Sequence, residues 1–108
     1  MTKIRHKLGK NYFAIEAKGH AGVTEQGEDV CCAVSTLMQT ALQVLLDMQY
    51  HEELETLHYH IESGDMYLFA NGKGWNSRKL KHCAEQLLTG LRLIEKKYPE
   101  HVQFVGVT

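Results

Sequence analysis

The sequence predicts an α+β domain of two layers, in which two helices cover one face of a mostly antiparallel sheet in the order β-β-α-β-β-α-β. Short segments with apolar residues at every second position are typical of strands, and two long segments with apolar residues every three or four positions are typical of amphipathic helices. Turn residues separate neighbouring strands, which indicates hairpins and antiparallel pairing. The 108 residues have the length of one domain, 1–108.

The first two strands are expected on either side of the turn Gly9-Lys10-Asn11. Residues 3–8 are rich in charge and are assigned to an edge strand. Residues 12–18 alternate, and their apolar side consists of Phe13, Ile15 and Ala17. This alternation predicts a strand with one buried face.

The first helix is predicted over residues 30–49, where apolar residues fall at steps of three and four. They are Val34, Leu37, Met38, Ala41, Leu45 and Met48. Residues 19–29 contain three glycines and have no periodicity, so they are predicted to form a loop. Asp29, at the end of this loop, is a suitable N-cap for the helix.

The second half of the chain is predicted to form a hairpin, a second helix and a last strand. A polar connection at 51–56 precedes strands at 57–62 and 66–70 around the turn Ser63-Gly64-Asp65, a loop at 71–76, a helix at 77–97 and a strand at 102–107. Asn76 or Ser77 caps this helix, and Pro99 ends it. Its apolar stripe consists of Leu80, Cys83, Ala84, Leu87, Leu91 and Ile94, which places Cys83 in the core.

Composition and charge argue against nucleic acid and membranes as partners. Lys and Arg number 12 and Asp and Glu number 13, whereas nucleic-acid-binding domains usually carry a strong basic excess. The richest apolar stretch, residues 41–48, is interrupted by Gln43 and Asp47, so no membrane span is expected. The charged N-terminus lacks the apolar region of a signal peptide. A cytoplasmic location is therefore expected, in which cysteines remain thiols.

Residues able to do chemistry concentrate between Gly19 and Ser35. Cys31 and Cys32 are expected in the first turn of the helix, where the helix dipole favours a thiolate and free N–H groups can stabilise an oxyanion. His20 lies across the loop and can accept the thiol proton, which makes the minimal pair for nucleophilic catalysis. The structural alternative is that the cysteines are small residues packed at the start of a helix.

Three motifs in this region resemble those of the ribosomal-processing cysteine protease family Prp. They are Gly19-His20-Ala21, Gly27-x-Asp29 and a Cys-x-Ala-Val-Ser run that ends at Ser35. The resemblance implies a cysteine endopeptidase with a Cys–His dyad and no cofactor or metal, which removes an N-terminal extension from a large-subunit ribosomal protein and is a homodimer. Phage structural proteins are a second implied class of substrate.

The resemblance also implies roles for single residues. His20 is the base, Asp29 and Ser35 support the site, and residues 21–28 form a mobile loop that covers an extended peptide substrate. The loop residues concerned are Gly19, Ala21, Gly22 and Gly27. The glycines leave this loop free to move, so we expect it to become ordered when the peptide binds.

The identity of the nucleophile is open, because the chain is one residue shorter than the family pattern between Asp29 and Ser35. Counting on from Asp29 or from His20 gives Cys32, whereas counting back from Ser35 gives Cys31. A deletion costs least in a loop, and inside a helix it rotates later side chains by about 100°. The register of the helix therefore favours Cys31, with Cys32 as the alternative.

The rival hypothesis is a non-catalytic homodimeric protein for binding or assembly, with a thiol-rich surface. In that case Cys31 and Cys32 could chelate a soft metal with His20. His58 and His60 share one face of a strand, but an exposed sheet face explains them better than a metal site, since no third ligand lies nearby in the sequence.

Overall fold

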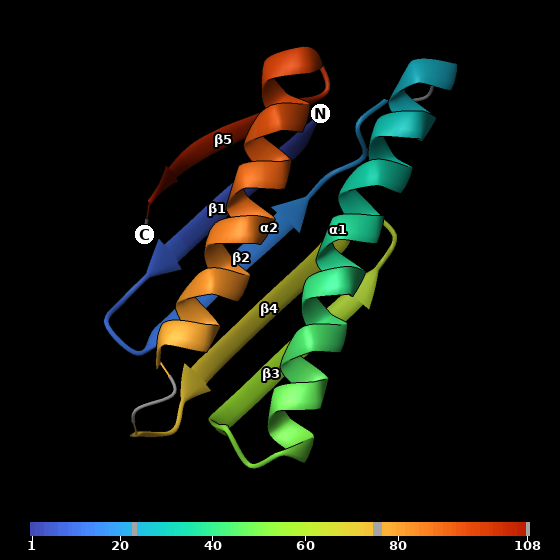
Figure 1. Cartoon of the computed structure of the whole chain (residues 1–108). Coiled ribbons are helices and arrows are strands. Elements are labelled where there is room, and N and C mark those ends of the chain that lie inside the picture. Colours follow the sequence, from blue (N-terminus) through green and yellow to red (C-terminus); the bar gives the residue numbers. More distant parts are fainter. Residues whose placement is uncertain (23, 75–76, 108) are drawn as a thin grey trace.

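The structure, a computed structural model, describes residues 1–22, 24–74 and 77–107, without the side chains of residues 77 and 107. Its elements are β1 (Thr2–Leu8), β2 (Tyr12–Lys18), α1 (Glu25–Tyr50), β3 (Leu54–Glu62), β4 (Asp65–Gly72), α2 (Ser77–Lys97) and β5 (Val102–Val107). Both helices lie on the same face of the sheet (Figure 1). The predicted fold class and element order are confirmed.

The sheet has the strand order β3-β4-β2-β1-β5. Among these strands β1 and β5 are parallel, and the other neighbours are antiparallel. The expectation that residues 3–8 form an edge strand is wrong, because β5 pairs with β1 on its outer side. Only one face of the sheet is covered, so an inner strand can carry exposed Lys3, Arg5 and Lys7 while Ile4 is fully buried.

The core lies between the helices and the sheet. The apolar side of β2, which consists of Phe13, Ile15 and Ala17, is fully buried as predicted. The predicted stripes of both helices face it: α1 contacts β3 and β4, and α2 contacts β2 and β5. The sulfur atom of Cys83 lies 4.0 Å from the carbonyl oxygen of Ala41, and burial raises the pKa of this thiol to about 11.

The first helix begins earlier than predicted. It starts at Glu25, and the hydroxyl oxygen of Thr24 accepts a hydrogen bond from the N–H of Gly27 at 3.1 Å. Asp29 is therefore not the N-cap; it is an exposed residue of the second turn. The predicted loop was too long because its last residues are polar and face solvent, so they show no apolar periodicity.

The bounds of both hairpin strands differ from the prediction: β4 runs from Asp65 to Gly72, so residues 71 and 72 belong to the strand and not to the loop. The strand β3 begins at Leu54, which is buried, so the polar connection is only residues 51–53. Trp75 and the alternative cap Asn76 lie outside the described residues. The second helix begins at Ser77 and ends at Lys97, as predicted.

The sequence predicts no membrane span, but by length and composition alone the helix α1 could cross a membrane. The helix α1 has 26 residues and contains a window with a mean hydropathy of 1.4. Its buried residues recur along one stripe that packs on the sheet, from Val30 to Met48. The core helix of a two-layer domain has the same composition, and we assign α1 to that role.

The two possible caps of α1 can be tested by matched substitutions. Thr24→Ala is expected to lower the free energy of unfolding by about 1 kcal/mol, because it removes the acceptor for the N–H of Gly27. Asp29→Ala is the control and is expected to change it by less than about 0.5 kcal/mol. Urea unfolding followed by circular dichroism measures both. A larger loss for Asp29→Ala would show that the helix begins where the periodicity begins.

Candidate active site

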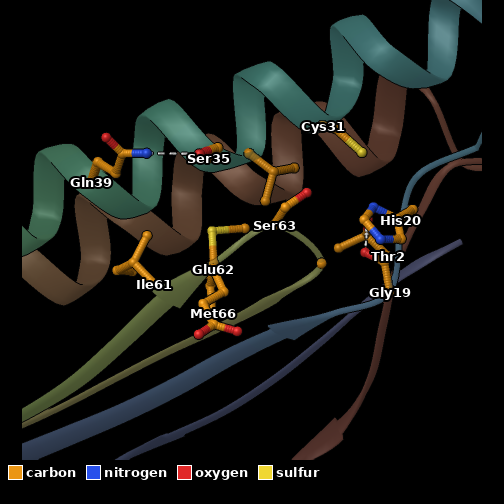
Figure 2. Close-up of a pocket in the computed structure, with 12 residues that line it drawn as sticks. Thr2, Gly19, His20, Cys31, Ser35, Gln39, Ile61, Glu62, Ser63 and Met66 are labelled. Carbon is orange, nitrogen blue, oxygen red and sulfur yellow. Dashed lines mark hydrogen bonds between the residues drawn. The ribbon is translucent and has the colours of Figure 1, made fainter.

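A pocket of about 240 Å³ lies between the first half of α1 and the turn that joins β3 to β4 (Figure 2). Its lining combines the imidazole of His20, the thiol of Cys31 and the carboxylate of Glu62 with apolar and uncharged polar residues. The lining residues are Thr2, Gly19, His20, Cys31, Val34, Ser35, Gln39, Ile61, Glu62, Ser63, Gly64 and Met66. The pocket thus brings together the start of the chain, the residues that follow β2, the first half of α1 and the β3–β4 hairpin.

His20 follows the end of β2 and lies against the β3–β4 turn. Gly19 has a φ of 95°, which turns the chain out of the strand, and its N–H donates to the carbonyl oxygen of Gly64 at 2.9 Å. The hydroxyl of Thr2 donates to the carbonyl oxygen of Gly19 at 2.9 Å. A Cβ atom at residue 64 would lie only 2.7 Å from Nε2 of His20, so the imidazole rests directly on the glycine.

Cys31 reaches the pocket from the second turn of α1 and is half-buried. Figure 2 shows its sulfur on the side of the helix that faces the segment carrying His20. The N–H of Ala21 donates to this sulfur at 3.0 Å. The expectation that Cys31 lies in the first turn is wrong because the helix starts at Glu25, and the donor that reaches the sulfur comes from the segment after β2.

Cys32 is exposed and is not among the described residues that line the pocket. Neighbouring residues of a helix point about 100° apart, so a helix that turns Cys31 into the pocket turns Cys32 away from it. The structure therefore groups His20 with Cys31 and separates both from Cys32. This arrangement does not favour joint chelation of a metal by the three side chains.

The supporting residues are divided between the pocket and the surface. Ser35 lines the pocket one turn after Cys31, and its hydroxyl accepts a hydrogen bond from the amide of Gln39 at 2.9 Å. Asp29 is exposed and lies outside the described lining of the pocket. Its expected capping role belongs to Thr24.

The glycine-rich segment packs on the start of α1. Gly22 has a φ of 144°, and a Cβ atom at Gly27 would lie 2.8 Å from the carbonyl oxygen of Gly22. Both glycines therefore permit close contact between backbones. Residues 25–28, which were expected in the mobile loop, form the first turn of α1, and residue 23 lies outside the described residues. Ordering of the remaining segment by a substrate stays a prediction.

Sequence reasoning missed the contribution of the β3–β4 turn to the pocket. The residues 63 and 64 were recognised as a turn, but their side chains suggest no chemistry. Only the register of the sheet reveals the link: Lys18 pairs with Asp65, so the residues that follow β2 meet the residues that precede β4.

The other histidines and acids form no comparable site. His58 and His60 are exposed on β3, and Nε2 of His60 lies 3.5 Å from a carboxylate oxygen of Glu62 and of Asp65. Over residues 1–22, 24–74 and 77–107, no group of three or more His, Cys, Asp or Glu side chains could hold a metal ion.

The sequence and the fold were compared with known proteins. The profile of the family described as cysteine protease Prp matches residues 1–103. No curated protein sequence matches the chain significantly. Since residues 1–103 include every residue that lines the pocket, the family match covers the whole site.

Three solved structures share the fold. The essential ribosomal processing protease Prp from S. aureus, in complex with a covalently linked product peptide, is 15% identical with a TM-score of 0.71, and both chains are covered in full. The same protease in complex with a substrate peptide is 14% identical with a TM-score of 0.71, and both chains are again covered in full. SMU.848 from Streptococcus mutans is 24% identical with a TM-score of 0.66, and 100% of this chain and 94% of that chain are covered.

The contact between His20 and the β3–β4 turn predicts different effects for two glycine substitutions. Gly64→Ala and Gly74→Ala both place a side chain at positive φ, 78° and 62°, and each is expected to cost about 1 kcal/mol of stability. Only Gly64→Ala adds a Cβ atom against His20, since among the described residues no atom lies within 4 Å of that position at Gly74. The imidazole signals of His20 in NMR spectra should therefore shift in Gly64→Ala alone. Equal shifts in both variants would contradict this contact.

Proposed function

The chain belongs to the cysteine protease Prp family and is therefore a peptidase, and from this premise we propose that Cys31 is its nucleophile and His20 its general base. One observation carries this assignment: both side chains line one pocket, and Cys32 is exposed outside it. The N–H of Ala21, which contacts the sulfur at 3.0 Å, is placed to stabilise a thiolate.

The proposed reaction proceeds through a thioester. The imidazole of His20 accepts the proton of the Cys31 thiol, and the sulfur attacks the carbonyl carbon of the peptide bond. The C–N bond then breaks, and the leaving amine takes the proton from His20. Water next gives a proton to His20 and attacks the thioester. The C–S bond breaks, the sulfur takes this proton back, and a carboxylic acid leaves.

The continuity of α1 bears on the choice between the two cysteines. The helix runs without a break from Glu25 to Tyr50, so the residue missing between Asp29 and Ser35 cannot lie in a loop. Cys31 and Ser35 stay on one face, four residues apart, and the change of register falls on the exposed side chain of Asp29. This geometry supports Cys31 as the nucleophile, but not because the missing residue lies in a loop, as was expected from the sequence.

We propose that the substrate is the N-terminal segment of a large-subunit ribosomal protein precursor, with phage structural proteins as the second class. The S. aureus homologue, a ribosomal processing protease, binds a substrate peptide. Val34, Ile61 and Met66 supply an apolar wall to the pocket, which suits an apolar side chain next to the cleaved bond. We further propose that the protein is a homodimer. We also propose a cytoplasmic location, which agrees with the three free thiols.

Single substitutions assign the two cysteines and His20. Cys31→Ser is expected to lower kcat/KM by about a thousandfold or more, because a hydroxyl is a much weaker nucleophile than a thiol. His20→Ala is expected to lose turnover, while Cys32→Ser keeps most of it. Precursor peptides of large-subunit ribosomal proteins serve as substrates, and mass spectrometry locates the cut.

The matched pair Cys31→Ser and Cys32→Ser makes this test decisive, because the same change is made at adjacent positions of one helix. Loss of turnover in Cys32→Ser alone would reverse the assignment. Full turnover in both variants would remove the proposed thiol mechanism. Circular dichroism of every variant shows whether a loss of turnover comes from loss of the fold.

A further inference from the structure

A third histidine contacts the segment next to the proposed dyad from the other end of the chain. His101 lies just before β5, and its Nδ1 is 2.7 Å from the carbonyl oxygen of Ala21. Its Nε2 is 3.0 Å from the side-chain oxygen of Gln26, in the first turn of α1. One imidazole thus joins the segment after β2 to the helix that carries Cys31.

The same residue, Ala21, contacts both His101 and Cys31. Its N–H donates to the sulfur at 3.0 Å, and its carbonyl oxygen receives the contact from His101. Ala21 is also only 2% exposed and directly follows His20 in the chain. The position of Ala21 therefore determines where the donor to the sulfur lies and constrains the backbone beside His20.

The chemistry of the partners fixes the direction of one hydrogen bond. A backbone carbonyl oxygen can only accept, so Nδ1 of His101 must carry the proton that it shares with Ala21. The amide of Gln26 can accept from Nε2 through its oxygen or, after rotation, donate to it through its nitrogen. The ring is therefore held on both sides while it donates to Ala21.

The backbone around His101 is fixed to two elements of the fold. Its carbonyl oxygen accepts from the N–H of Thr2 at 2.9 Å, and its own N–H donates to the carbonyl oxygen of Tyr98 at 3.0 Å. Gly22 lies beside the ring, where a Cβ atom would be in ordinary contact with Nδ1 at 3.4 Å. The backbone of His101 is thus bonded to β1 and to the residue that follows α2, while its imidazole contacts the less regular segment between β2 and α1.

We propose that His101 is a positioning residue of the protease: it holds Ala21 so that the N–H of Ala21 points at the sulfur of Cys31. This inference rests on the proposed role of Cys31 as the nucleophile. His101 is not among the described residues that line the pocket, so it acts through Ala21 and not on the substrate. Its effect is expected on the reactivity of the thiol and on kcat rather than on KM.

The test compares three variants in the full chain. His101→Ala is expected to lower the rate constant for alkylation of Cys31 by iodoacetamide about tenfold and to lower kcat similarly, with KM changed less than about twofold. His101→Asn is expected to recover most of both, because its amide nitrogen can donate to Ala21 from nearly the same place. His51→Ala is the matched control: Nδ1 of His51 also contacts a backbone carbonyl, that of Asp47 at 2.8 Å, but at the other end of α1.

Fragment mass spectrometry separates labelling of Cys31 from labelling of Cys32, and the rate constant is calculated per folded molecule. This readout needs no substrate. If no precursor peptide is cut but His101→Ala slows alkylation and His101→Asn restores it, the proposed substrate fails and the positioning role stands. Alkylation of Cys31 at the wild-type rate in His101→Ala would overturn the positioning role of His101. Equal impairment of His101→Ala and His101→Asn, in step with their loss of thermal stability, would also overturn it.

Discussion

The antiparallel pairing of β2 with β4 is the constraint on which the site depends. These strands are separated in the chain by the whole of α1 and β3, yet they pair from Tyr12 with Asn71 to Lys18 with Asp65. The register ends so that Gly19 meets Gly64, and His20 is placed on the β3–β4 turn. A shift of the register by one residue would also turn the buried side of β2 toward solvent, so the core and the site are fixed by the same pairing.

The location of Cys31 follows from the packing of α1 on the β3–β4 hairpin. Because α1 packs across β3 and β4, its residues that face the turn are those near its start, and Cys31 and Ser35 are among them (Figure 1). Glycines allow two close contacts in the site. The imidazole of His20 packs directly on Gly64, and Gly22 and Gly27 let the segment after β2 lie against the first turn of α1. The contact of Gly22 with Gly27 is between backbones and that of Gly64 is with a side chain, and residue chemistry alone reveals neither.

The existence and type of every element could be predicted from the sequence, because each buries one face and its apolar residues therefore recur with a period. What could not be predicted has a different physical origin. The first turn of α1 is polar and exposed except for Gly27, which has no side chain, so only the capping contact of Thr24 marks it. The position of β1 inside the sheet depends on its parallel pairing with β5, whose residues lie 100 or 101 positions further along the chain. For the pocket, local chemistry indicated His20, Cys31 and Ser35, whereas Gly64 lines it through long-range packing. His101, which is not among the described lining residues, reaches Ala21 in the same way.

The corrected start of α1 changes the account of how the thiol is activated. The field of a helix terminus falls off within the first turn, and Cys31 lies beyond it. The dipole therefore contributes less to a thiolate at Cys31 than the sequence suggested, and stabilisation must come from groups in contact with the sulfur. The N–H of Ala21 is such a group, and it comes from the residue next to His20. In the proposed mechanism the donor to the sulfur and the base come from adjacent residues, so a contact that holds Ala21 also constrains His20. The short segment that carries both contacts Gly64 through His20 and His101 through Ala21, and the proposed activation of the thiol depends on these two contacts.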